Sequence, residues 1–212
     1  MKKIINLVLI GSLSFSMFSI GKKMYINHLN KITYEKTREE KVEMLKEYDW
    51  ITIPNTYIDY PIAYGEGNDY YLNHDINGKE NSAGSIFYSE EDEPFNKLNT
   101  IIYGHCLRNG KMFNNLHTFK DKDVFEKSKV ILETKNGETK EYLPLGIYLT
   151  NEDFFYFDLD NMEINEAVEL IQEKSMHKLD VDYNENSTLL TLLTCDYSEE
   201  GNRLIVFYIN NN

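Results

Sequence analysis

A succession of short strand-like segments, running from Trp50 almost to the C-terminus, limits the fold more strongly than any other feature of the sequence. Each segment is rich in β-branched and aromatic residues and ends near a turn-forming residue. Asn136-Gly137, between two of the segments, is a strong hairpin signal. About eight strands at this spacing predict a mainly β domain, a closed or nearly closed β-barrel with few helices. The segments are residues 51–54, 57–62, 84–88, 100–104, 129–134, 140–150, 187–194 and 203–209.

Helical patterns interrupt the strands in three places. Short helices are predicted at residues 68–72 and at 112–119 with 123–125. A longer one is predicted over 164–178, because its apolar residues recur at near-helical spacing. These apolar residues are Ile164, Val168, Ile171 and Met176.

The N-terminal segment is apolar and uncharged between two pairs of lysines. Residues 4–21 carry no charged side chain, and a helix of this length spans about 27 Å. No convincing cleavage site of small residues follows, so we predict an uncleaved signal-anchor over residues 1–23. Residues 24–48 alternate charged and apolar side chains and predict a helical juxtamembrane stalk. Residues 49–212 then form the main domain.

Charge and cysteine content exclude several classes of protein. The chain has 22 Lys and Arg against 35 Asp and Glu, a net charge of −13. Binding to nucleic acid needs the opposite sign. Two cysteines in 212 residues can form neither a disulfide scaffold nor a zinc site made only of cysteines. The acidic run at residues 90–93 is interpreted as a solvated loop rather than a calcium site.

Three side chains at predicted strand ends supply the parts needed for acyl transfer. Cys195 ends one strand, and Arg203 begins the next after a turn-like segment of seven residues. Opposite partners in such a hairpin project from the same face of the sheet. His105 follows another strand end. A thiol, an imidazole and a guanidinium could act as nucleophile, proton donor and oxyanion stabiliser. On these residues alone, a buried cysteine and a surface arginine are the commoner interpretation.

The motifs that contain these three side chains resemble those of the sortase family. Thr191-Leu-Leu-Thr-Cys195 resembles the family's TLxTC signature, Arg203 follows at the usual interval, and Tyr103-Gly-His105 matches the strand end that carries the sortase histidine. The resemblance runs from Trp50 to Ile209 and is greatest for class B. Class B features are the N-terminal stalk, the helix over 164–178, and the segments 68–72, 84–87 and 112–116.

The resemblance implies a fold, a location and a reaction. The fold would be an eight-stranded sortase barrel with flanking helices. It would lie outside a Gram-positive cell, on a single-pass anchor in the cell membrane. Cys195 would attack a carbonyl in the sorting signal of a secreted protein, His105 would protonate the departing amine, and Arg203 would hold the substrate carbonyl or oxyanion. An amine of a peptidoglycan precursor or a pilin would then resolve the thioacyl enzyme. This chemistry requires no metal or cofactor.

The resemblance also suggests substrate-binding positions. Asn68, Leu72 and Tyr103 fall where class B enzymes line the substrate groove, and Thr194 lies beside the nucleophile. Core packing explains Leu72 and Tyr103 equally well.

The chain departs from the family's pattern around the nucleophile. Leu193 occupies a position that is often Ser in class B. Asp196 directly follows Cys195, whereas the acidic residue proposed as a third catalytic member in some relatives falls at the position of Tyr197. No Asp is therefore placed in the catalytic set.

Cys106 occupies a position where sortases more often have Asn. Alternation along a strand would turn its side chain away from the site that His105 enters. It is therefore predicted to be structural rather than the partner of Cys195 in a redox disulfide. The remaining histidines show no ligand spacing with cysteine and are assigned no role: His28, His74, His117 and His177.

Two other functions remain open at this point. One is a hydrolytic cysteine peptidase, whose product would not change when an amine acceptor is added. The other is a catalytically idle, membrane-anchored scaffold that binds sorting signals and would tolerate Cys195→Ala.

Overall fold

The computed structural model describes residues 15–26, 28, 32, 35–37, 39–89 and 94–211, which fall into two compact units, 1–40 and 41–212. In the first unit, residues 15–26 are helical and expose apolar side chains such as Phe18 and Met24. Among the described residues, no helix is both long enough and apolar enough to cross a membrane. Residues 1–14 of the predicted anchor, part of the predicted stalk and the acidic run at 90–93 lie outside the described residues. The anchor and the stalk therefore stay predictions.

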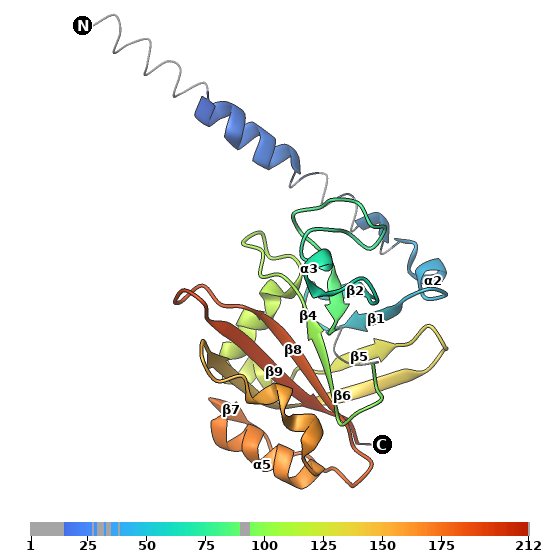
Figure 1. The fold of residues 1–212 in the computed structure, drawn as a ribbon, viewed down its shortest axis with the longest axis vertical. Helices are drawn as coiled ribbons and strands as arrows, with labels where there is room; N and C mark the ends of the chain where they lie inside the picture. The colour runs from blue at the N-terminus through green and yellow to red at the C-terminus, as the bar shows by residue number, and fades with distance from the viewer. Residues whose placement is uncertain are drawn as a thin grey trace, which may run out of the picture. The chain divides into compact units, whose positions relative to one another are not determined.

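The second unit is built on a β-barrel (Figure 1). In the described residues the strand order is β5-β1-β2-β3-β4-β8-β9-β6-β7, and a further pairing of β5 with β6 closes eight strands into a ring. The barrel predicted from the sequence is confirmed. The strands are β1 (Asp49–Thr52), β2 (Asp59–Ala63), β3 (Ile86–Tyr88), β4 (Asn99–Tyr103), β5 (Val130–Glu133), β6 (Thr139–Thr150), β7 (His177–Lys178), β8 (Leu189–Cys195) and β9 (Arg203–Ile209).

Short helices precede β1 and occupy several of the connections between strands. The α-helices are α2 (Lys41–Met44), α3 (Asn68–Tyr71), α4 (Lys122–Phe125) and α5 (Ile164–Lys174), and the 3₁₀ helices are η1 (Phe113–Lys120), η2 (Phe155–Phe157) and η3 (Leu159–Asn161). The predicted Asn136-Gly137 hairpin is present between β5 and β6, where Gly137 has φ of 86°.

The pairing of β8 with its two neighbours determines where the strand ends lie. β8 pairs in parallel with β4 and antiparallel with β9. Alternate residues of β8 therefore line two different faces. On one face Leu193 belongs to an apolar cluster with Val168 and Ile171 of α5. On the other face Leu192 is fully buried, as expected for the barrel interior.

The helix predicted over 164–178 ends four residues early. α5 ends at Lys174, and the Met176 amide donates to the carbonyl of Ile147. Residues 177 and 178 then pair with β6 as β7. Backbone pairing with an available sheet edge thus outweighs the helical spacing of the apolar residues. Met176, which was predicted to lie on the buried stripe, is 46% exposed.

η1 places polar side chains beside the end of β8. Phe113, Leu116 and Phe119 recur every three residues and are buried, as the three-residue turn of a 3₁₀ helix requires. His117 and Lys120 are less buried, and both reach the segment that follows β8.

Candidate active site

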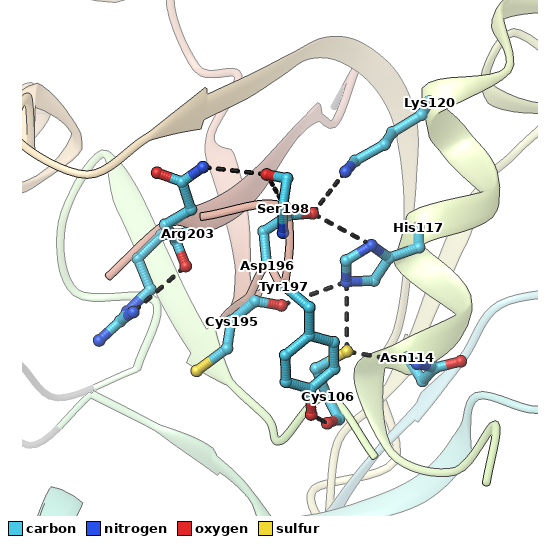
Figure 2. A network of polar contacts seen from close by, with 10 residues as sticks. Cys106, Asn114, His117, Lys120, Cys195, Asp196, Tyr197, Ser198 and Arg203 are labelled. Atoms are coloured by element: carbon cyan, nitrogen blue, oxygen red, sulfur yellow. Dashed lines mark hydrogen bonds and ion pairs between the residues drawn. The ribbon is translucent and has the colours of Figure 1, made fainter. Parts of the chain in front are cut away.

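The β8–β9 hairpin brings Cys195 and Arg203 together. They are the last and first residues of their strands and are directly paired, so the prediction from the loop length is confirmed. Figure 2 shows the thiol and the guanidinium on the same side of the hairpin. Arg203 Nη1 donates to the carbonyls of Gly201 at 2.9 Å and Asn202 at 3.2 Å. The guanidinium is therefore held by its own loop beside the thiol.

His105 reaches the same place from β4. Tyr103 pairs with Leu193, and the Gly104 amide continues the ladder with a bond to the Leu193 carbonyl at 3.1 Å. β4 ends at Tyr103, and this register, extended two residues past that end, aligns His105 with Cys195 on the same face of the sheet. Cys195 ends β8, Arg203 begins β9 and His105 follows the end of β4, and these three strands are neighbours in the sheet.

A main-chain carbonyl sets the tautomer of His105. Its Nε2 lies 2.8 Å from the Leu72 carbonyl, which can only accept a hydrogen bond. Nε2 therefore carries a hydrogen, and Nδ1 is the nitrogen left to exchange a proton with a reacting group.

Glycines make room around His105. A Cβ on Gly104 would lie 2.5 Å from Ile86 Cδ1 and 2.7 Å from Phe113 Cδ2. Gly84 has φ of +62°, and a Cβ there would lie 2.5 Å from the Tyr71 carbonyl oxygen. The strand end that carries His105 can pack this closely only because both residues lack a side chain.

The four predicted substrate-binding residues occupy different places. Leu72 supplies the carbonyl bound by His105, and Tyr103 stacks on Phe87 with ring centroids 5.4 Å apart. Thr194 is buried on the opposite face from Cys195, and its hydroxyl donates to the Gly104 carbonyl at 2.7 Å. Asn68 is the first residue of α3, the short helix that leads to Leu72.

A polar network behind Cys195 was not anticipated from the sequence (Figure 2). His117 Nδ1 lies 3.2 Å from Asp196 Oδ2, and His117 Nε2 lies 3.1 Å from the Cys195 carbonyl oxygen and 3.2 Å from Cys106 Sγ. The Asn114 amide donates to the same sulfur at 3.2 Å. His117 is 78 residues from Cys195 in sequence, and no spacing pattern links the two.

Asp196 is the anionic centre of this network. Its side chain is 1% exposed and accepts an ion-paired hydrogen bond from Lys120. The other carboxylate oxygen accepts from the amide and the hydroxyl of Ser198. Burial opposes ionisation most strongly, but the bonds from Lys120 and Ser198 outweigh it and lower the pKa of Asp196 to about 2.

Cys106 lies within the network and is separate from the Cys195 thiol. Both cysteines are free, and Cys106 is 3% exposed. Burial raises the pKa of the Cys106 thiol, although the hydrogen bond from Asn114 opposes this. Figure 2 shows the Cys195 thiol pointing away from Cys106.

The described residues contain the components of acyl transfer at one strand edge. Cys195, which is partly exposed, offers a thiol, His105 an imidazole with one nitrogen available, and Arg203 a cation. Among the described residues, no group of three or more His, Cys, Asp or Glu side chains is arranged to hold a metal ion.

Comparison with known proteins agrees with this chemistry. The family profile described as "Sortase domain" matches residues 51–208. Sortase B of Listeria monocytogenes is 30% identical over 96% of this chain and 94% of its own length.

Solved structures give the same result. The crystal structure of Clostridium perfringens sortase B superposes with a TM-score of 0.72 at 28% identity, covering 82% of this chain and all of that one. A Streptococcus pyogenes class B sortase involved in pilus biogenesis has a TM-score of 0.70 at 28% identity, covering 77% of this chain and 91% of that one. These matches show that the chain belongs to the sortase family and is a cysteine transpeptidase of the class B type.

Proposed function

We propose that the enzyme cleaves a sorting signal near the C-terminus of secreted proteins and joins the new carboxyl end to an amine of the cell wall or of a pilin. The direct pairing of Cys195 with Arg203, with His105 two residues after the end of the neighbouring strand β4, carries this proposal. Nucleophile, oxyanion stabiliser and proton donor must all act on one carbonyl group.

In the proposed first half-reaction, Cys195 Sγ passes its proton to His105 and attacks the carbonyl carbon of the scissile peptide. The electron pair of the C=O bond moves to the oxygen, where the Arg203 guanidinium stabilises it. Collapse of this intermediate breaks the C–N bond, and the departing amine takes a proton from His105. The product is a thioester between the substrate and Cys195.

The second half-reaction uses the same groups in reverse. The acceptor amine attacks the thioester carbonyl and gives up a proton to His105. The Cys195 sulfur leaves, and a new amide bond joins substrate and acceptor. Arg203 uses Nη1 for its bonds to Gly201 and Asn202, so the N–H groups of Nη2 and Nε can donate to the substrate oxygen.

The predicted substrate-binding residues support the groove in different ways under this proposal. Tyr103 and Leu72 contribute partly exposed surface next to His105. Thr194 keeps β4 and β8 in register through Gly104, so it acts on the position of Cys195 rather than by contact with the peptide. Asn68 is proposed to contact the peptide from the start of α3.

The N-terminal segment is proposed to hold the enzyme at the outer face of the cell membrane. The uncharged run of residues 4–21 between lysine pairs supports an anchor. Deleting residues 1–23 should give a soluble enzyme that still ligates. Loss of the fold in this variant would show that the segment belongs to the core.

A ligation assay tests the proposed reaction. The full chain in mild detergent is incubated with a library of sorting-signal peptides and either a wall-type peptide amine or a lysine-containing pilin peptide. Mass spectrometry should detect products that link a cleaved peptide to the amine. Cleavage that ignores the amine would show a hydrolytic peptidase, and peptide binding that survives Cys195→Ala with no cleavage would show a scaffold.

A further inference from the structure

His117 lies where it can control the main chain that carries the nucleophile. Its Nε2 is 3.1 Å from the carbonyl oxygen of Cys195, and its Nδ1 is 3.2 Å from Asp196. A carbonyl and an ionised carboxylate can only accept hydrogen bonds. The His117 ring therefore lies between the Cys195 carbonyl and the Asp196 carboxylate, with one nitrogen facing each of them.

The carboxylate that orients His117 is itself fixed. Asp196 is nearly inaccessible to solvent, and Lys120 and Ser198 donate to its two oxygens. A buried carboxylate with these partners has little freedom to move. The ring of His117 is thereby held in one orientation against the end of β8.

The same network holds the segment that carries His105. Cys106 directly follows His105, and its sulfur lies 3.2 Å from both His117 Nε2 and Asn114 Nδ2. The Tyr197 hydroxyl donates to the Cys106 carbonyl. The network thus forms hydrogen bonds with the Cys195 carbonyl and with Cys106, the residue that follows His105.

We propose that His117 is a positioning residue that fixes the separation of the Cys195 thiol from the His105 imidazole. The Cys195 and His105 side chains make none of the network's contacts themselves; His117 acts on their main chain. This inference rests on the proposed function, because it assumes that Cys195 and His105 react together.

The His117→Gly variant tests this role. Losing the bond to the Cys195 carbonyl should lower kcat for ligation about 10-fold to 100-fold, the cost of a displacement of about 1 Å at a reacting group. KM for the sorting peptide should stay unchanged, since His117 lies behind the thiol. Unchanged kcat, or a change confined to KM, would overturn the proposal.

Chemical rescue separates positioning from a general loss of packing. The His117 side chain is 24% exposed, so added imidazole can enter the space left by the deletion. Imidazole should restore kcat, while 1-methylimidazole should not, because its methyl group prevents one of the two nitrogens from approaching Asp196 or the Cys195 carbonyl. Equal rescue by the two compounds would contradict the proposal.

His177 offers a matched control. Its Nε2 lies 2.8 Å from the Lys120 carbonyl at the end of η1, and it has no described bond to the Cys195 segment. His177→Ala should keep kcat within about twofold of wild type. A loss equal to that of the His117 variant would show that both histidines serve only to hold η1.

Two further measurements test the positioning role of His117. If His117→Gly does not melt cooperatively, Asp196→Asn replaces it, and a kcat loss of a few-fold without a KM change is expected. The alkylation rate of Cys195 by iodoacetamide, resolved from Cys106 by peptide mass spectrometry, needs no sorting peptide. It should fall several-fold in His117→Gly and recover with imidazole, even if wild-type enzyme ligates no peptide tested. An unchanged alkylation rate would overturn the positioning role, whereas absent ligation by wild type would overturn only the proposed function.

Discussion

The two sides of the β8–β9 strand end are organised differently. On the side of the Cys195 thiol, the hydrogen bonds that Arg203 makes within the described residues go to carbonyls of its own loop, and Cys195 is partly exposed. On the side of the Cys195 carbonyl, His117 and Asp196 belong to a network of buried and partly buried hydrogen bonds. The side chains of Cys195 and Arg203 are free to move towards a substrate. The main chain that carries Cys195 is held in place by hydrogen bonds.

Removing the nucleophile should have the largest effect. Cys195→Ala should lower the ligation rate by at least about 1000-fold. Catalytic residues that act together as a unit each abolish most of the rate when removed. His105→Ala and Arg203→Ala should act similarly and without additivity. The thermal midpoint should barely change, because the thiol side of the strand end contributes few contacts. Near-normal ligation by Cys195→Ala would show that the Cys195 thiol is not the nucleophile.

The Arg203→Lys variant tests whether oxyanion stabilisation needs the planar shape of the guanidinium or only its positive charge. A lysine keeps the positive charge but loses the planar fork that can hold an oxyanion with two parallel bonds. We expect kcat to fall about 100-fold, the scale of one lost oxyanion donor, with stability unchanged. Full activity in the lysine variant would mean that charge alone is sufficient.

Gly104→Ala tests how tightly the strand end of His105 is packed. The added methyl would lie within 3 Å of Ile86 and Phe113 side-chain atoms. Overpacking of this kind costs about 1–3 kcal/mol of unfolding free energy, and any relief by movement of β4 would also displace His105. Chemical denaturation and kcat should both register the change. A variant as stable as wild type would show that Phe113 can move aside.

Asp196 makes the carbonyl side sensitive to acid. Its pKa is lowered to about 2 from an ordinary value of 3.8, so its stabilising contribution is present above pH 4 and is lost as pH falls from 4 towards 2. A shift of this size corresponds to about 2 kcal/mol. Asp196→Asn lacks this contribution, so the stability difference between wild type and variant should shrink over that range. A difference that stays constant with pH would contradict the ionised network.

The smallest effect is expected for oxidation. Cys106 is buried and its sulfur is engaged by His117 and Asn114, while the Cys195 thiol points the other way. Thiol titration of air-exposed, denatured protein should count two free thiols, and activity should not depend on reductant. Zero free thiols, with activity restored by reductant, would show that Cys106 and Cys195 can form a disulfide.

The barrel and the thiol side were predictable because their signals are local. Alternating β-branched residues predicted the strands, and the seven-residue loop before Arg203 was enough to place it opposite Cys195. The TLLTC and YGH motifs then matched a known family. These features depend on neighbours in sequence or on one hairpin.

The carbonyl side could not be predicted for the opposite reason. His117 meets Cys195 only because η1 packs three aromatic and aliphatic side chains into the core and leaves His117 beside a strand end 78 residues away. The early end of α5 has a similar cause, since the β6 edge that captures residues 176–178 lies about thirty positions upstream. Neither the His117–Cys195 contact nor the end of α5 is indicated by a pattern in the nearby sequence.

The insertion of β8 between β4 and β9 also affects the order in which the enzyme can fold. β4 pairs with residues 189–193, about ninety positions further along the chain, and contacts between such distant segments form slowly. Until β8 arrives, the edge of β4 stays open and can pair with another chain. A chain that emerges N-terminus first therefore acquires its reactive thiol and closes its barrel in the same late step. Truncations that remove β8 should yield aggregation-prone proteins rather than inactive monomers.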